Sequence, residues 1–158
     1  MARPKPKAKK QLNLLVIHGP NLNLLGEREP RMYGKVSLSR INQLIQGEAR
    51  RLGVRVVIVQ SNHEGELVDL IGQARKEYHG ILINPAAYTH TSVALRDALS
   101  ACGIPAVEVH LSNIYGREEF RRQSLTAEVC IGQVSGFGGE SYLLGLQGLT
   151  NKLRNKKT

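Results

Sequence analysis

The residue pair with the clearest chemistry is Glu108 and His110, which stand two apart in the run PAVEVH over 105–110. A run this rich in β-branched residues predicts a buried strand, and alternate residues of a strand share one face. A carboxylate beside an imidazole fixes its tautomer and raises its basicity, which suits a general acid or base. An ordinary buried ion pair would use the same two residues, so the pair alone leaves both interpretations open.

Polar clusters also follow two other predicted strands. The strand over 12–18 runs into HGPN (18–21), and the strand over 80–84 runs into NPA (84–86) and on to His90. Amides and imidazoles recognise hydroxyl and carbonyl groups, and these clusters lack the repeated cations of a nucleoside triphosphate site. His90 is predicted either to contact a ligand or to be a structural hydrogen bonder. His18, His63 and His79 are expected to be structural.

A long charged loop over 25–34, LGEREPRMYG, follows the first strand. It is longer than most connections between a strand and a helix, and glycines bound it on both sides. Loops of this kind are often lids over active sites, although a mobile surface loop has the same composition. Arg28 and Tyr33 are its chemically interesting members.

The elements that must position these residues alternate along the chain. Strand patterns cover 12–18, 54–60, 80–84, 105–110 and 128–135. Helical periodicity covers 38–52, 67–74, 93–102 and 142–153, with Gly53 and Gly103 as stops and Thr91 or Ser92 as a cap. This alternation predicts a flavodoxin-like, doubly wound α/β fold, with a five-stranded parallel sheet and helices on both faces. Ligands bind such sheets outside the carboxyl ends of the strands, where the polar clusters lie.

The 158 residues correspond to about one domain, which we place at 11–150. The net charge of +9 comes from two basic ends, 1–10 and 151–158, because acidic and basic side chains balance between them. We interpret these ends as disordered tails, with a nucleic-acid arm as the alternative. No apolar run is long enough to span a membrane, and no His, Cys and carboxylate set has zinc spacing. Two cysteines and the lack of a signal peptide favour a cytoplasmic location.

Several long motifs, in order, resemble the type II 3-dehydroquinate dehydratases over about residues 12–150. They are HGPNLN (18–23) with LG (25–26), REP (28–30), YG (33–34), QSNHEG (60–65), NPAAYTHTS (84–92), LRD (95–97), EVH (108–110) and REEFR (117–121). The resemblance implies dehydration of 3-dehydroquinate to 3-dehydroshikimate, in aromatic biosynthesis or quinate breakdown. It also implies a homododecamer built from trimers, with no cofactor and no metal.

The resemblance assigns a role to each motif residue. Tyr33 would be the base, with Arg28 and Arg117 lowering the pKa of its phenol. Asn21 would stabilise the enolate, through a water molecule, and His110, oriented by Glu108, would protonate the departing hydroxyl. Asn84, the backbone N–H of Leu111 and Ser112 would bind the carboxylate end of the substrate. His90 and Arg121 would bind the distal hydroxyls. Asp97 would act from or near an adjacent subunit.

Three other function classes are alternatives. A receiver domain needs an acidic pocket at the ends of the first and third strands, where this chain has His18 and Asn84. An RNA-binding module would depend on the basic tails. A Schiff-base dehydratase needs a buried lysine, whereas residues 11–150 contain only Lys35 and Lys76, neither at a strand end.

Overall fold

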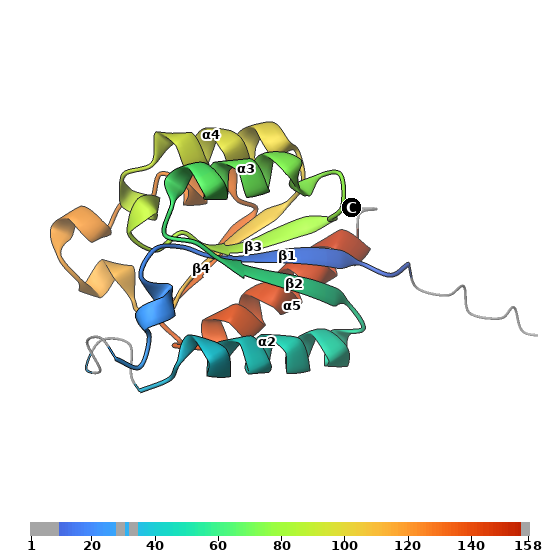
Figure 1. Ribbon diagram of the computed structural model, residues 1–158, viewed down its shortest axis with the longest axis horizontal. Coiled ribbons are helices and arrows are strands. Elements are labelled where there is room, and N and C mark those ends of the chain that lie inside the picture. The colour runs from blue at the N-terminus through green and yellow to red at the C-terminus, as the bar shows by residue number, and fades with distance from the viewer. Residues whose placement is uncertain (1–9, 28–30, 32–34, 156–158) are drawn as a thin grey trace, which may run out of the picture.

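The computed structural model describes residues 10–27, 31 and 35–155. Its centre is a sheet of five parallel strands in the order β2-β1-β3-β4-β5 (Figure 1). The strands are β1 (Asn13–His18), β2 (Arg55–Gln60), β3 (Gly80–Asn84), β4 (Ala106–His110) and β5 (Gly132–Ser135). This is the flavodoxin-like order, so the predicted doubly wound α/β fold is confirmed.

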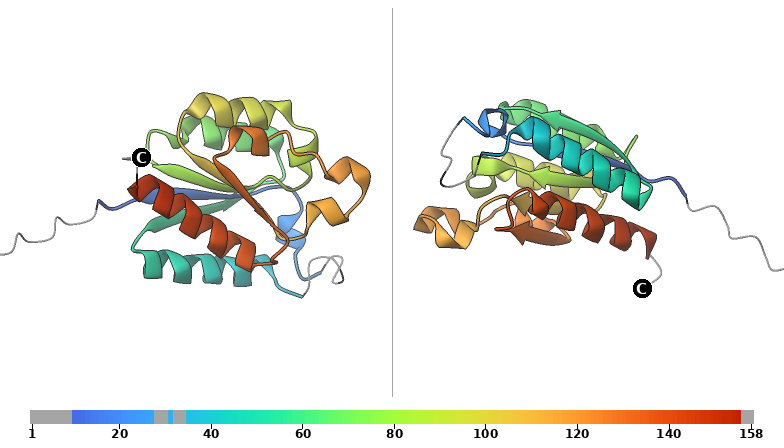
Figure 2. Two further views of the ribbon diagram at one scale, coloured as in Figure 1. Left: turned by 180° about the vertical axis from the view of Figure 1, so that it is seen from behind. Right: turned by 90° about the horizontal axis from the view of Figure 1, so that it is seen from below.

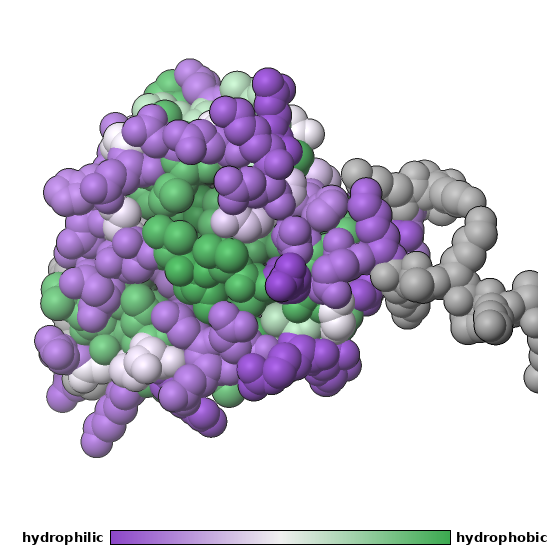
Figure 3. Space-filling view, turned by 45° about the vertical axis from the view of Figure 1, so that its right-hand side comes forward, coloured by the Kyte–Doolittle hydropathy of each residue, from purple (hydrophilic) through white to green (hydrophobic). Residues whose placement is uncertain are grey.

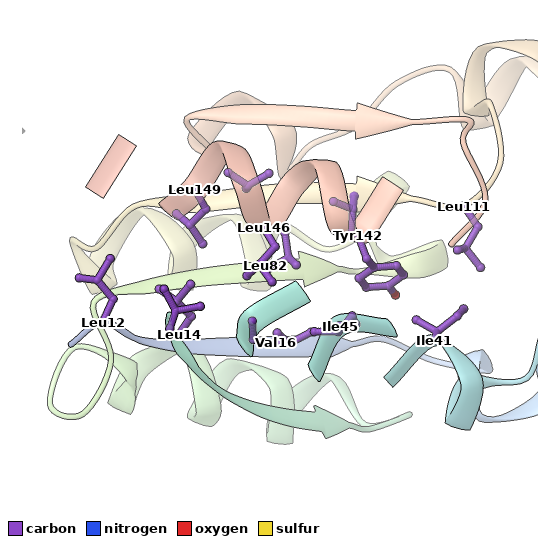
Figure 4. Close-up of a cluster of buried hydrophobic side chains, with 14 of the residues drawn as sticks. Leu12, Leu14, Val16, Ile41, Ile45, Leu82, Leu111, Tyr142, Leu146 and Leu149 are labelled. Atoms are coloured by element: carbon purple, nitrogen blue, oxygen red, sulfur yellow. The ribbon is translucent and has the colours of Figure 1, made fainter. Parts of the chain in front are cut away.

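Two pairs of helices cover the sheet. Helices α3 (Glu64–Ala74) and α4 (Val93–Cys102) lie on one face, and α2 (Leu38–Leu52) and α5 (Glu140–Arg154) lie on the other (Figures 1 and 2). Each face has its own apolar core. The core under α2 and α5 includes Leu14, Val16, Ile45 and Leu146 (Figure 4). Central strands buried on both faces explain why β1 and β3 are apolar between their ends.

The helix ends match their sequence signals. Ser37 caps α2 by accepting a hydrogen bond from the backbone N–H of Arg40, and Gly53 ends that helix with a positive φ of 67°. Of the two candidate caps for α4, Ser92 is the one that accepts from the N–H of Leu95. The two serine caps mark where α2 and α4 begin, and therefore where the loops that follow β1 and β3 end.

Two boundaries differ from the sequence expectation. The fifth strand was expected to begin at Glu128, but Ala127–Val129 is a short 3₁₀ turn and β5 begins at Gly132. The Ser124 hydroxyl accepts a hydrogen bond from the Ala127 N–H, which holds this segment in a turn. At the other end, α5 continues to Arg154 and buries Leu153, so the first part of the expected tail 151–158 is helical.

The described chain ends lie far from the carboxyl ends of the strands. Residue 10 leads into the start of β1, and residue 155 follows α5 on the same side of the molecule (Figures 1 and 2). The loops after β1, β3 and β4 gather at the opposite side. Among the described residues, no helix is long and apolar enough to cross a membrane.

Candidate active site

A pocket opens at the carboxyl ends of β1, β3 and β4, at the edge of the sheet that the fold class predicts. The residues that line it include eight of those singled out from the sequence: Asn21, Asn84, His90, His110, Leu111, Ser112, Arg117 and Arg121. Apolar side chains also line the pocket, among them Leu22, Leu24 and Leu25 from the turn after β1. The sequence analysis did not single out these three leucines.

The turn after β1 brings Asn21 to the pocket. A Cβ on Gly19 would lie 2.5 Å from the carbonyl oxygen of Pro85, so only glycine lets the ends of β1 and β3 approach this closely. Asn21 then adopts a left-handed φ of 66°, which asparagine tolerates better than most residues. Its backbone N–H donates to Oδ1 of Asn62, 2.9 Å away, and this bond holds the turn.

At the end of β3, Asn84 is 3% exposed and held at both ends of its amide. Its Oδ1 accepts from the backbone N–H of Ala86 at 3.0 Å, and its Nδ2 donates to the hydroxyl oxygen of Tyr142 at 3.1 Å. Ala86 has a positive φ of 52°, an unfavourable conformation for a residue with a Cβ. The Asn84 side chain supports that strained turn while facing the pocket.

At the end of β4, Glu108 is fully buried and surrounded by donors. The Thr89 hydroxyl donates at 2.6 Å, the Ser124 hydroxyl at 2.9 Å and the Gln133 amide at 2.7 Å, and the Thr126 hydroxyl also donates. Burial alone would raise the pKa of the carboxyl. His110 and the hydroxyls of Thr126 and Thr89 outweigh burial and lower the pKa to about 2. Glu108 is therefore an anion at neutral pH.

His110 lies directly over this anion. Its Nε2 is 3.1 Å from Oε2 of Glu108, within ion-pair distance, although the two atoms are not aligned as a hydrogen bond. The side chain is almost fully buried, yet the ring also borders the pocket. The carboxylate therefore lies against one ring nitrogen, in a residue that also lines the pocket. This arrangement suits an imidazole that gives or takes a proton.

The remaining rim is basic. Arg121 is ion-paired with Glu118 at 2.9 Å, and Nε of Arg117 lies 3.7 Å from the same carboxylate. His90 Nδ1 donates to the carbonyl oxygen of Gln123 at 2.7 Å. Burial lowers the pKa of His90, so at neutral pH its Nε2 carries a lone pair that accepts a hydrogen bond. The rim thus offers both donors and acceptors to a polar ligand.

Some expected residues lie elsewhere. Asp97 is exposed on α4 and is not among the described residues that line the pocket. Arg28 and Tyr33 lie outside the described residues. The hydroxyls and the Gln133 amide around Glu108 were missed by the sequence analysis. Thr89 stands in the motif NPAAYTHTS (84–92) and Gln133 in the predicted fifth strand, where it proves to be the register partner of Glu108, but the sequence suggested no role for either. No group of three His, Cys, Asp or Glu among the described residues has the arrangement of a metal site.

Comparison with known proteins gives one consistent result. The family model described as dehydroquinase class II matches residues 12–150. The 3-dehydroquinate dehydratase of Trichodesmium erythraeum is 62% identical over 144 residues, which cover 91% of this chain and 96% of that protein. The enzyme of the same name from Nostoc sp. is 61% identical over 143 residues, covering 90% of this chain and 97% of that one.

Solved structures agree. The type II dehydroquinase of Butyrivibrio crossotus superposes with a TM-score of 0.86 at 43% identity, covering 88% of this chain and 97% of that one. The type II dehydroquinase of Propionibacterium acnes gives 0.85 at 37% identity, with 89% and 97% covered.

Proposed function

The chain belongs to the class II dehydroquinase family, and on that basis we propose that its strand-end pocket dehydrates 3-dehydroquinate to 3-dehydroshikimate. The chain is a hydro-lyase, and the reaction is a step of the shikimate pathway to aromatic compounds. The observation that carries the proposal is the Glu108–His110 pair, whose imidazole borders a pocket dense in amides, imidazoles and guanidinium groups.

The chemistry sets three requirements. The substrate is a β-hydroxy ketone, so losing water means removing a proton next to the ketone and protonating the departing hydroxyl. An anti elimination through an enolate needs a base, a group that stabilises the enolate, and an acid. His110 is the acid in this proposal, because its ring borders the pocket and its Nε2 lies 3.1 Å from the Glu108 carboxylate.

Asn21 is proposed to stabilise the enolate oxygen through a water molecule. Its left-handed backbone lies in the turn after β1, the strand that pairs with β3, and its side chain lines the same pocket as Asn84. The proposed substrate-binding set is Asn84, Leu111, Ser112, His90 and Arg121. A buried donor left without a partner costs about 1–3 kcal/mol, so this dense polar set rejects substrates that lack matching hydroxyls.

The proposed base is Tyr33, assisted by Arg28, both outside the described residues. A phenol has a pKa near 10, and one neighbouring cation lowers a pKa by about 1–3 units. Lowering it to about 7–8 is therefore at the upper limit of what Arg28 alone gives. Arg117 is the proposed second cation, since it lines the described part of the pocket.

The family resemblance also implies the homododecamer built from trimers, and we propose it here. Several large apolar side chains are exposed on the single chain, among them Val57, Ile131 and Phe137. Figure 3 shows a broad hydrophobic area on the side of the molecule where the edge strand β2 lies. Such areas are typical of protein interfaces. Asp97, exposed on α4, is proposed to act at a neighbouring subunit's pocket. The cytoplasmic location stays a prediction.

The direct test is an ultraviolet assay on adding 3-dehydroquinate, because the product is a conjugated enone. We expect absorbance to rise with the wild-type protein and not with Tyr33→Phe, which should still bind substrate. A wild-type protein that produces no enone would overturn the function, and near-normal kcat in Tyr33→Phe would remove Tyr33 as the base. Deleting 1–10 and 156–158 should leave activity intact, since the described chain ends lie away from the pocket.

Borohydride distinguishes this chemistry from the Schiff-base route. Lys35 and Lys76 are both exposed, and neither is among the described residues that line the pocket. Treatment with borohydride and substrate should therefore leave activity unchanged, and a covalent adduct on either lysine would refute the non-covalent mechanism.

A further inference from the structure

A chain of four buried or half-buried polar side chains crosses the molecule from α2 to the pocket. Asn42 on α2 contacts His18 at the end of β1, His18 contacts Tyr142 on α5, and Tyr142 contacts Asn84 at the end of β3. His18 and Tyr142 are 0% exposed. Figure 4 shows Tyr142 projecting from α5 into the apolar layer between helices and sheet. A polar chain in such a layer is costly unless every member is satisfied.

The donor and acceptor roles in this row of hydrogen bonds follow from the bond that the backbone N–H of Ala86 makes. The N–H of Ala86 is a donor, so the Asn84 atom 3.0 Å from it must be the oxygen, Oδ1. The Asn84 nitrogen, Nδ2, therefore faces Tyr142, and the hydroxyl oxygen of Tyr142 is the acceptor at 3.1 Å.

Each later bond is then determined. Since the Tyr142 oxygen accepts from Asn84, its own hydrogen is free for Nδ1 of His18, 2.7 Å away. At the other end, Oδ1 of Asn42 can only accept, so Nε2 of His18 carries the proton and donates it at 2.8 Å. Nδ1 of the neutral ring is then the acceptor for the Tyr142 hydrogen. The structure thus selects one neutral tautomer of His18. Burial agrees with this, because it lowers the pKa of His18 to about 4 and raises the pKa of Tyr142 far above its usual value.

Only one member of the chain reaches the pocket wall, and that is Asn84. One of its two Nδ2 hydrogens is committed to Tyr142, and its oxygen is committed to Ala86. The second Nδ2 hydrogen remains for a ligand. We propose that His18 and Tyr142 are positioning residues that hold the Asn84 amide in one orientation, so that its second hydrogen is presented to an oxygen of the substrate.

This inference rests on the proposed function, because it takes Asn84 as a substrate-binding residue. It goes beyond that function because two core residues, His18 and Tyr142, would control substrate affinity. Tyr142 lies on α5, which has no residue among the described ones that line the pocket. His18 and Asn84 are register partners on adjacent strands, so a shift of either strand would break the chain. Asn84 would then turn within its site, and its donor would be lost to the substrate without any change at His110.

The test is a double-mutant cycle on the steady-state kinetics of 3-dehydroquinate turnover. Tyr142→Phe removes the hydroxyl and keeps the ring. We expect its KM to rise about five- to tenfold, with kcat within about twofold of wild type. In the Asn84→Ala background the same substitution should change KM by less than about twofold, because the amide that it positions is gone. Tyr78→Phe, in the apolar core on the opposite face of the sheet, is the matched control and should leave KM unchanged.

A second variant covers the case in which Tyr142→Phe does not fold. Asn42 lies on α2 at the far end of the chain and is only half-buried. Asn42→Leu should raise KM in the same way as Tyr142→Phe, but by less. Asn42→Asp should have a KM close to that of the wild type near pH 8, since a carboxylate still accepts from Nε2 of His18. Nitrogen-15 NMR of the wild-type His18 ring should find the proton on Nε2.

The outcomes separate the two proposals. If the wild-type protein makes no product, the proposed function fails, and the positioning role fails with it. If the wild-type protein is active, three results overturn the positioning role alone: an unchanged KM in Tyr142→Phe, an equal effect with and without the Asn84 amide, or a His18 ring protonated on Nδ1.

Discussion

Oε2 of Glu108 lies 3.1 Å from Nε2 of His110, and the partners that hold the carboxylate in place are otherwise uncharged. This matters because an arginine in the same position would neutralise the carboxylate and remove its attraction for an imidazolium. Hydroxyls and an amide keep Glu108 ionised while leaving its charge to act on His110. This arrangement supports the proposed role of His110 in proton transfer.

Glu108→Gln tests this relationship. The substitution keeps the shape of the side chain but removes the negative charge that lies 3.1 Å from Nε2 of His110. We expect kcat to fall by about 100-fold or more, the lower range of general acid–base effects. Steady-state kinetics measure it, and Glu128→Gln, an exposed carboxylate paired with Arg96, is the control. Equal kcat values in the two variants would show that the Glu108 charge is not used.

The hydroxyl donors of Glu108 give a second prediction. Thr126→Val keeps the volume of the side chain and removes one donor to the carboxylate, so the free energy of unfolding should fall by about 1–3 kcal/mol and kcat should also fall.

Thr150→Val is the matched control for Thr126→Val. The Thr150 hydroxyl is equally buried but has no hydrogen-bond partner among the described residues, so its loss should be neutral or stabilising. Chemical denaturation of both variants measures the difference, and equal losses would contradict the assigned role of Thr126.

The sequence predicted the Glu108–His110 pair because strand periodicity is local, and two residues apart on a strand means one face. It could not predict the donors around Glu108, since Thr89, Ser124 and Thr126 come from irregular segments that meet only in the folded chain. The same reason explains the misplaced start of the fifth strand. The apolar pattern of 128–131 resembles a strand, but the neighbouring hydroxyls tie that segment to Glu108 instead.

His18 illustrates the same limit. The sequence predicts only a structural role for it. Its partner could not be found from spacing, because Tyr142 is 124 residues away along the chain. The predicted parallel sheet nevertheless placed the carboxyl ends of the strands at one edge, which is why Asn21 and Asn84 could be expected at one site. Topology is therefore readable from the sequence pattern, whereas contacts that cross from a helix to a strand end are not.

Helix α5 must approach the sheet closely for Tyr142 to reach Asn84, and Gly145 permits this. A Cβ at Gly145 would lie 2.6 Å from Val109 and 2.8 Å from Leu82, so Gly145→Ala should destabilise the protein by about 1–3 kcal/mol. Gly148→Ala on the same helix meets nothing within 4 Å among the described residues and should stabilise by up to about 1 kcal/mol. Thermal unfolding compares them, and a Gly145→Ala variant as stable as Gly148→Ala would contradict the close packing.

The neutral His18 also makes stability depend on pH. In the unfolded chain its pKa is 6.5, and burial lowers it to about 4 in the folded protein. Between these values the unfolded state binds a proton that the folded state does not, so acidification favours unfolding. From about pH 7.5 to about pH 5, His18 should remove about 2 kcal/mol from the free energy of unfolding. His90 shifts in the same direction, whereas Glu108 adds its own loss only below its unfolded pKa of 4.5.

His18→Gln isolates this contribution. The variant cannot take up the proton, so its free energy of unfolding should fall by about 2 kcal/mol less than that of the wild type over the same pH interval. It should be less stable at about pH 7.5, because the bonds to Tyr142 and Asn42 are disturbed, and the two curves should converge as the pH falls. Urea denaturation at several pH values gives both curves. Parallel curves would mean that His18 has the same pKa in the folded and the unfolded chain, which would contradict its burial as a neutral ring.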